Sequence, residues 1–165
     1  MRQIALVVHN VRSAHNVGSL LRTADGLGVD RVYLSGYTPY PAAKNDARLP
    51  HEASKVNRRI QKTALGAEIT AKWDHADDIH QILNELRTQR YQIVALEQTP
   101  EATSLPKFKA SSNIALVVGS EVGGLEQNIL DLCDKYVQIP MSGKKESYNV
   151  ATAAAMALYH LRYIA

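Results

Sequence analysis

Three short segments of this sequence carry more polar, glycine and small residues than a packed fold needs. The first runs from residue 16 to residue 24, where Arg22 follows Gly18 by one helical turn and lies off the apolar stripe. An arginine on such a slim helix face can bind a phosphate through two parallel N–H donors. Taken alone, Arg22 is also consistent with an ordinary exposed helix residue, and this alternative stays open.

The second segment, from Gly119 to Leu125, directly follows an apolar run. In parallel α/β sheets ligands bind beyond the carboxyl ends of the strands, and glycine there lets a ligand approach backbone N–H groups. The spacing matches neither the P-loop nor the Gly-x-Gly-x-x-Gly pattern, so sites for nucleoside triphosphates and dinucleotides are weakly supported. A plain glycine-rich turn is the alternative, but such a turn has no need of a carboxylate such as Glu121.

The third segment, from Ile139 to Val150, places Ser147 and Asn149 at the start of the last helix. Capping of that helix is enough to explain both residues. The helix itself has alanine at positions 151, 153, 154, 155 and 157. So many small side chains permit close packing by another helix or by a neighbouring chain.

Alternating strands and helices must position these segments. Continuous apolar runs predict buried strands at 4–8, 91–96 and 114–118, and shorter runs predict strands at 31–35 and 136–139. Apolar residues at helical spacing predict helices from an N-cap at Asn16 to a stop at Gly28, over about 55–65 and 74–89, and over 149–163. Residues 37–54 contain three prolines and are expected to form a long loop.

Buried strands that alternate with helices predict an α/β fold with a parallel sheet covered on both faces. Because the composition shows no boundary, residues 1–165 are expected to form a single domain. The one cysteine, Cys133, excludes a disulfide framework and a cysteine-based zinc site. The six histidines show no metal-binding spacing, so we expect no metal.

No apolar run approaches the length of a membrane helix, and the amino terminus lacks the form of a signal peptide. We therefore expect a cytoplasmic protein without a membrane partner.

The net charge of +3 is concentrated in one stretch. Between residues 37 and 62 lie two acidic and six basic residues, the basic ones being Lys44, Arg48, Lys55, Arg58, Arg59 and Lys62. Such a stretch is typical of a surface that binds a polyanion, although a solvated basic loop is the alternative. Tyr37 and Tyr40 belong to the same stretch and could stack on unpaired bases.

Taken together and in this order, the three segments resemble the motifs of the SpoU/TrmH branch of the SPOUT superfamily, over about residues 9–161. Members of that family are RNA ribose 2′-O-methyltransferases that use S-adenosylmethionine and release S-adenosylhomocysteine. The resemblance implies a single-domain α/β fold with a C-terminal deep trefoil knot (the SPOUT fold), a homodimer, and tRNA or, next, rRNA as the substrate. It also implies a methyltransferase domain without a separate RNA-binding extension, so the stretch with six basic residues would bind the RNA.

By resemblance, the cofactor-binding positions are Leu96, Gly119, Ile139, Met141 and Tyr148. Tyr148 departs from the family, which usually has leucine or methionine between the serine and the asparagine. The positions that match the family's catalytic residues are Arg22, Asn16, Glu121, Ser147 and Asn149.

Chemistry constrains the roles that these catalytic positions can take. An arginine, with a pKa above about 12, is a poor base at neutral pH. We therefore expect Arg22 to orient the hydroxyl and to stabilise the developing alkoxide. The resemblance implies that Asn16 and Glu121 position Arg22, and that Ser147 and Asn149 order the knot loop and the substrate.

The alternative function is a non-catalytic RNA-binding or RNA-assembly module that keeps the knotted scaffold. Loss of Arg22 or Asn149 would have favoured it, and both residues are present.

Overall fold

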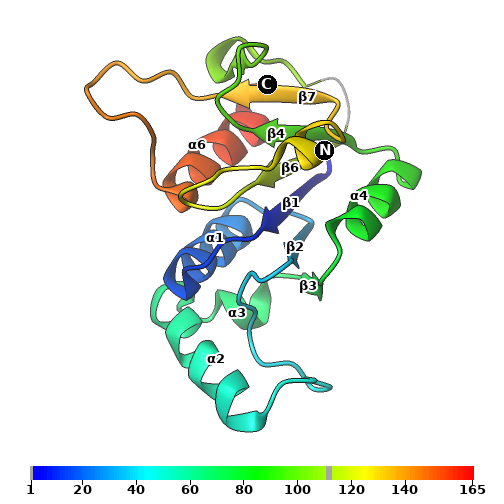
Figure 1. Cartoon of the computed structure of the whole chain (residues 1–165), viewed down its shortest axis with the longest axis vertical. Coiled ribbons are helices and arrows are strands. Elements are labelled where there is room, and N and C mark those ends of the chain that lie inside the picture. The colour runs from blue at the N-terminus through cyan, green and yellow to red at the C-terminus, as the bar shows by residue number, and fades with distance from the viewer. Residues whose placement is uncertain (1, 111–112) are drawn as a thin grey trace.

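The computed structural model describes residues 2–110 and 113–165. Within them, seven parallel strands form one sheet in the order β3-β2-β1-β6-β4-β7-β5 (Figure 1). The strands are β1 (Ile4–His9), β2 (Arg31–Ser35), β3 (Trp73–Ala76), β4 (Gln92–Leu96), β5 (Thr103–Ser104), β6 (Ile114–Val118) and β7 (Lys135–Gln138). The predicted parallel α/β sheet is confirmed.

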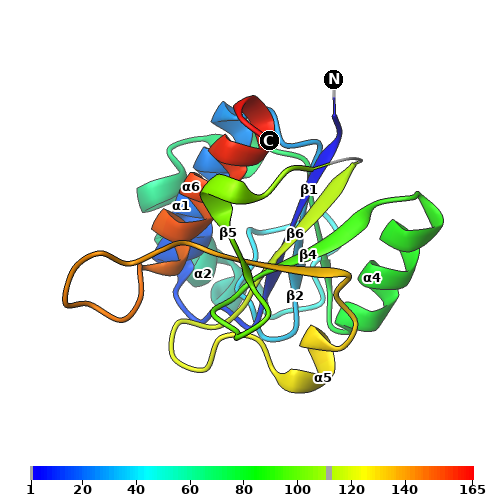
Figure 2. The ribbon, with the colours of Figure 1, turned by 90° about the horizontal axis from the view of Figure 1, so that it is seen from above.

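Helices cover both faces of this sheet. They are α1 (Ala14–Gly26), α2 (Pro50–Ala64), α3 (Ala67–Thr70), α4 (Ile79–Thr88), α5 (Gln127–Leu130) and α6 (Val150–Tyr163), with a 3-10 turn η1 (Leu105–Lys107). Figure 2 shows α1 and α6 on one side of the sheet and α4 on the other. Alternate residues of β1 belong to the two cores: Leu6 and Val8 lie with α1 and α6, and Val7 lies with α4. Burial on both faces explains the continuous apolar runs in the sequence.

Several element boundaries differ from the predicted ones. Ser13, not Asn16, is the N-cap of α1, because its hydroxyl accepts a hydrogen bond from the Asn16 N–H at 3.2 Å. Helix α2 begins at Pro50 rather than near residue 55, since proline is favoured in the first turn of a helix. The helix predicted over 74–89 was wrong in its first part, which forms strand β3, and Asp78 caps the start of α4.

The topology brings several strand ends together at one edge of the sheet. Strand β1 lies between β2 and β6, and the chain passes from β1 to β2 on one side and returns to β6 on the other. This is the switch point at which open α/β sheets bind their ligands. Residues 9–13, after β1, and 119–125, after β6, flank it. The loops after β4 and β7 end at the same edge because all these strands are parallel.

Helices α1 and α2 pack with their backbones close together. A Cβ added at Gly18 would come within 2.9 Å of the Ala64 nitrogen and closer still to the Ile60 carbonyl oxygen. The hydroxyl of Thr63 donates a hydrogen bond to the His15 carbonyl oxygen at 2.7 Å. The slim face of α1 around Gly18 is therefore covered by the backbone of α2.

The last helix is fixed against the segment that follows η1. His160 Nε2 lies 2.9 Å from the carbonyl oxygen of Phe108. The guanidinium of Arg2 donates to the carbonyl oxygens of Ala110 and Leu161, at 2.5 and 2.8 Å. These contacts hold α6 in place after the chain has crossed from β7 through residues 139–149 (Figure 1).

Candidate active site

The carboxylate of Glu121 joins the two loops that flank the switch point. It accepts hydrogen bonds from the backbone N–H groups of Arg12 and Ser13, each at 3.1 Å, and from the Asn16 side chain at 2.9 Å. Burial alone would raise the pKa of Glu121, but the hydrogen bond from Asn16 and those from backbone N–H groups outweigh burial and lower the pKa. Glu121 is therefore an anion at neutral pH, and its charge holds the start of α1 in place.

Asn16 and Asn149 extend this connection to the last helix. The Asn149 side chain donates to Asn16 Oδ1 at 3.1 Å, while its own Oδ1 accepts the Ala151 N–H at 2.9 Å and caps α6. Asn149 thus caps its helix and also belongs to the site, so the two interpretations of this residue are compatible. A line of hydrogen bonds runs from Glu121 through Asn16 and Asn149 to α6.

Arg22 lies on the exposed side of α1. Within residues 2–110 and 113–165, no hydrogen bond or ion pair engages its guanidinium. Glu121 and Asn16 form no hydrogen bond or ion pair with the Arg22 side chain, and they act on its position through the start of the helix. The guanidinium is therefore free to meet a ligand.

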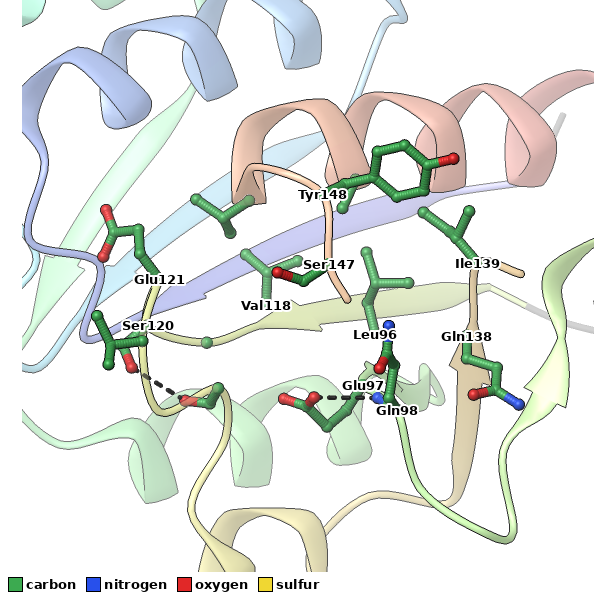
Figure 3. Close-up of a pocket in the computed structure, with 15 residues that line it drawn as sticks. Leu96, Glu97, Gln98, Val118, Ser120, Glu121, Gln138, Ile139, Ser147 and Tyr148 are labelled. Carbon is green, nitrogen blue, oxygen red and sulfur yellow. Dashed lines mark hydrogen bonds between the residues drawn. The ribbon is translucent and has the colours of Figure 1, made fainter. Parts of the chain in front are cut away.

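A cavity of about 200 Å³ opens beside this hydrogen-bonded line. Its walls come from the ends of β4, β6 and β7 and from the start of α6, and they are Leu96, Glu97, Gln98, Val118, Gly119, Ser120, Glu121, Val122, Gly124, Gln138, Ile139, Ser147, Tyr148, Val150 and Ala153. Figure 3 shows Glu121 and Ser120 on one side of the cavity and Ile139 with Tyr148 on the other.

The cavity brings together six of the ten expected cofactor-binding and catalytic residues. Four of the five expected cofactor positions line it, and Met141 does not. Tyr148 does line it, with 41% of its surface exposed. Among the expected catalytic residues, Ser147 and Glu121 line the cavity. Asn16 and Asn149 lie behind Glu121 in the hydrogen-bonded line.

Glu97 is a residue of the candidate site that no sequence pattern had singled out. Its carboxylate accepts the Leu125 N–H at 2.9 Å and the Gln98 N–H at 3.0 Å, so it ties the loop after β4 to the loop after β6. The second loop is closed by paired hydrogen bonds of 3.1 Å between Ser120 and Gly124. Gly124 has a positive φ, and a Cβ there would overlap the Glu97 carboxylate.

Four of the six basic residues share one face of α2. Lys55, Arg58, Arg59 and Lys62 follow the spacing i, i+3, i+4, i+7 and are exposed, opposite the buried Ala53, Ile60 and Ala64. We call these four residues the α2 cationic face. Lys44 is exposed in the preceding loop.

Arg48 is engaged within the protein. Its guanidinium donates to the Asp46 carboxylate at 2.6 and 2.8 Å and to the carbonyl oxygens of Tyr40 and Pro41, each at 3.0 Å, and it covers the Tyr40 ring. The side-chain hydrogen bond from Arg48 lowers the pKa of Asp46. Arg48 therefore stabilises its own loop, and Tyr40, which also stacks on His75, has no free ring face for a base.

The described residues contain no group of three His, Cys, Asp or Glu side chains placed to hold a metal ion. None of the helices in this part of the chain has the length and apolar character needed to cross a membrane.

The fold and the cavity define the class as an α/β protein with a cavity at the carboxyl ends of β4, β6 and β7, next to the switch point of a parallel sheet. The chain belongs to the SpoU rRNA Methylase family, whose sequence model matches residues 3–159.

Two curated relatives illustrate the similarity. The chain is 30% identical over 156 residues to the 23S rRNA (guanosine-2′-O-)-methyltransferase RlmB of Bordetella pertussis. It is 27% identical over 156 residues to a Staphylococcus aureus protein named for the TrmH family of tRNA/rRNA methyltransferases. Both alignments cover 94% of this chain but only 58% and 57% of the two relatives. The chain therefore spans little more than half of the length of these relatives.

Solved structures share the fold. The SpoU methyltransferase AviRb of Streptomyces viridochromogenes, in complex with AdoMet, has a TM-score of 0.78 at 21% identity, over 95% of this chain and 57% of that one. A structure described as giving insights into the 2-OH methylation of C/U34 on tRNA has a TM-score of 0.72 at 23% identity, over 96% of this chain and 93% of that one.

Proposed function

We propose that this protein transfers a methyl group from S-adenosylmethionine to a ribose 2′-hydroxyl of RNA. The observation that carries the proposal is the cavity at the carboxyl ends of β4, β6 and β7, which is lined by four expected cofactor positions and by Glu121, with Asn16 and Asn149 hydrogen-bonded behind it. Membership of the SpoU family supports it, as do the 2′-O-methylation named for RlmB and the AdoMet bound to AviRb.

The lining of the cavity fits S-adenosylmethionine. The apolar side chains of Leu96, Val118 and Ile139 can contact a purine ring, and the loops that follow their strands offer backbone groups to its polar edge. When bound, the cofactor supplies an electrophilic methyl group on a sulfonium, and transfer of this group requires no metal ion. We assign the cofactor-binding role to Leu96, Gly119, Ile139 and Tyr148, and we leave Met141 without a contact.

The protein's task is then to position and desolvate the reacting groups. Arg22, whose guanidinium is free, would orient the ribose hydroxyl and stabilise the negative charge that develops on its oxygen. The hydrogen-bonded line from Glu121 to Asn149 fixes the start of α1 against the start of α6, and so fixes the helix that carries Arg22. Ser147, on the cavity wall, would contact the substrate or order the loop.

The substrate we propose first is tRNA, with rRNA second. The solved structure described for 2-OH methylation on tRNA matches 96% of this chain and 93% of its own, whereas RlmB is named for 23S rRNA. The α2 cationic face and Lys44 would contact phosphates, because they are exposed cations on one side of the molecule. Arg48 would support this surface through its loop.

We also propose a homodimer, a C-terminal knot and a cytoplasmic location. An apolar groove lined by Leu105, Pro106, Ala155, Met156 and Ile164 lies along α6, and the exposed Tyr159 borders it, so a second copy could pack there. The placement of β7 between β4 and β5, and of α6 against segment 105–110, supports a C-terminal segment that passes through a loop.

The deciding experiment incubates the protein with labelled S-adenosylmethionine and total cellular RNA, then maps methylated riboses by mass spectrometry. We expect a 2′-O-methyl group at a defined tRNA nucleotide; methylation of rRNA alone would select the second substrate. Absence of transfer to either RNA would overturn the proposal. Calorimetry with S-adenosylhomocysteine identifies the non-catalytic RNA module, which should not bind it.

Replacing Glu97 by alanine is expected to weaken S-adenosylhomocysteine binding about tenfold. The Leu125 N–H loses its acceptor, at a cost of about 1–3 kcal/mol, and the loop after β6 is released from the loop after β4. Calorimetry measures the affinity. Glu97→Gln should retain most of it because one acceptor oxygen remains. Glu101→Ala, at an exposed carboxylate of the same loop, is the control. Equal affinity in Glu97→Ala and the wild type would contradict the role of Glu97.

Replacing Arg58 and Arg59 together by glutamine is expected to weaken RNA binding and to lower its salt dependence. Each lost phosphate contact reduces the slope of log K against log [salt] by about 0.7–0.9. Fluorescence anisotropy with labelled bulk tRNA at several salt concentrations measures both quantities. Lys107 and Lys109, exposed near η1 and away from α2, provide the matched double variant. A slope that does not change would place the RNA surface elsewhere.

A further inference from the structure

The side chain of Arg12 lies outside the cavity lining and has no role in the site described so far. It belongs to the loop between β1 and α1, and its backbone N–H donates to Glu121, which lines the cavity. The side chain of Arg12 is exposed. The oxygens of Glu121 are taken by N–H groups, and no ion pair to the Arg12 guanidinium occurs in the described parts of the chain.

Tyr37 is brought beside Arg12 by an unusual backbone arrangement. The Tyr37 N–H donates to Asn10 Oδ1 at 3.2 Å, and the Asn10 N–H donates to the Ser35 carbonyl oxygen at 3.2 Å. Asn10 has a φ of 56° and Gly36 a φ of 64°, both in the left-handed region. A Cβ at Gly36 would overlap the Asn10 side chain. The loops after β1 and β2 are therefore held together at a defined distance.

The side chains of Arg12 and Tyr37 lie next to each other on the protein surface. The guanidinium carbon of Arg12 lies 5.7 Å from the centroid of the Tyr37 ring, and Tyr37 is 55% exposed. Tyr40, in contrast, lies between His75 and Arg48. Of these two tyrosines, only Tyr37 presents its ring to a ligand, and it does so beside an unpaired cation.

An exposed aromatic ring beside an arginine suits a single-stranded nucleotide. Bases stack on aromatic rings whatever their sequence, and a guanidinium binds phosphate through two N–H donors. We propose that Tyr37 and Arg12 hold the nucleotide next to the target, with the base on the ring and the phosphate on the guanidinium. This inference rests on the proposed function, which requires the target ribose to reach the cavity lined by Glu121, the residue to which the Arg12 N–H donates.

This arrangement divides RNA binding between two surfaces. The α2 cationic face would hold the body of the RNA by its phosphates, whereas Arg12 and Tyr37 would hold one unpaired nucleotide near the cavity. Loss of the Arg12–Tyr37 pair should therefore lower the affinity for RNA and leave the affinity for the cofactor unchanged, because neither residue lines the cavity.

The test measures binding of labelled bulk tRNA and, in parallel, of total ribosomal RNA, at several salt concentrations and with S-adenosylhomocysteine present. The variants are Arg12→Ala, Tyr37→Ala and Tyr37→Phe. Lys72→Ala, which removes an exposed cation before β3 at the opposite edge of the sheet, is the control. Calorimetry with S-adenosylhomocysteine monitors the site itself.

We expect Arg12→Ala to weaken RNA binding about five- to tenfold and to lower the salt slope by about 0.7–0.9. Tyr37→Ala should weaken it by about fivefold or more without changing the slope, as expected for lost stacking, and Tyr37→Phe should bind as the wild type does. Cofactor affinity should stay constant throughout.

Unchanged RNA affinity in both alanine variants overturns the inference, and so does a parallel loss of S-adenosylhomocysteine affinity, which would make the pair structural. A wild-type protein that binds neither RNA also overturns it. Failure of the proposed function gives a different result: RNA binds and depends on Arg12 and Tyr37, but no methyl group is transferred.

Discussion

Replacing Arg22 by alanine is expected to lower the rate of methyl transfer to RNA by about a hundredfold or more, while the melting temperature and the affinity for S-adenosylhomocysteine stay unchanged. A single donor aimed at a developing oxyanion typically contributes this much to the rate. The fold should be unaffected because the Arg22 side chain is exposed and makes no hydrogen bond or ion pair within the described residues. Single-turnover kinetics with saturating cofactor isolate the transfer step.

Two matched variants separate charge from geometry at this position. Arg22→Lys keeps the positive charge but loses the planar fork, so we expect it to recover only a small part of the rate. Asp25→Ala alters an exposed side chain nearly one turn further along the same helix and should transfer at the wild-type rate. An Arg22→Ala protein with the wild-type rate would remove Arg22 from the mechanism.

Replacing Gly119 by alanine is expected to weaken S-adenosylhomocysteine binding at least about tenfold and to destabilise the fold by about 1–3 kcal/mol. A Cβ at this position would come within 2.7 Å of the Leu125 nitrogen and closer still to the carbonyl group of Gly124. All of these atoms belong to the backbone, so no side chain can move aside. The loop after β6 would have to open, and that loop forms one wall of the cavity.

Gly123 provides the control within the same loop. A Cβ there would meet only the Ser120 hydroxyl oxygen, at 3.4 Å. Gly123→Ala should therefore bind S-adenosylhomocysteine as the wild type does, although it also adds a methyl group to a glycine-rich turn. Calorimetry and thermal melts on the pair distinguish a steric requirement from a general need for glycine. Equal behaviour of Gly119→Ala and Gly123→Ala would contradict the steric account.

The sheet could be predicted because its strands are continuous apolar runs, a pattern that burial on both faces requires. Strand β3 could not, since its four residues Trp73–Ala76 are all half-buried and mix polar with apolar side chains. The start of α1 was misplaced because asparagine and serine are both good N-caps. Ser13 takes that role and leaves the Asn16 side chain free to join Glu121 to Asn149.

The candidate site could be predicted where a local sequence motif marks a residue that lines the cavity, as at Gly119 and Glu121. It could not be predicted where a residue contacts another that lies far from it in the chain. Glu97 bonds to the backbone 28 residues further along the chain, and Arg12 meets Tyr37 across two loops. The count of charges grouped Arg48 with the other basic residues as an RNA-binding residue, but its guanidinium donates hydrogen bonds to the carboxylate of Asp46, two positions before it. Such pairings depend on how the loops fold, which periodicity does not describe.

The backbone contact between α1 and α2 at Gly18 has a consequence for substrate choice. Because α2 packs directly over Gly18, with the Ile60 carbonyl oxygen and the Thr63 hydroxyl against it, the separation between the α2 cationic face and Arg22 is fixed by the fold. Under the proposed function, the distance between the phosphates bound by the α2 cationic face and the ribose at Arg22 is then constant. The protein would select a ribose by its distance from an anchored stretch of phosphates, and therefore by the shape of the RNA more than by its sequence.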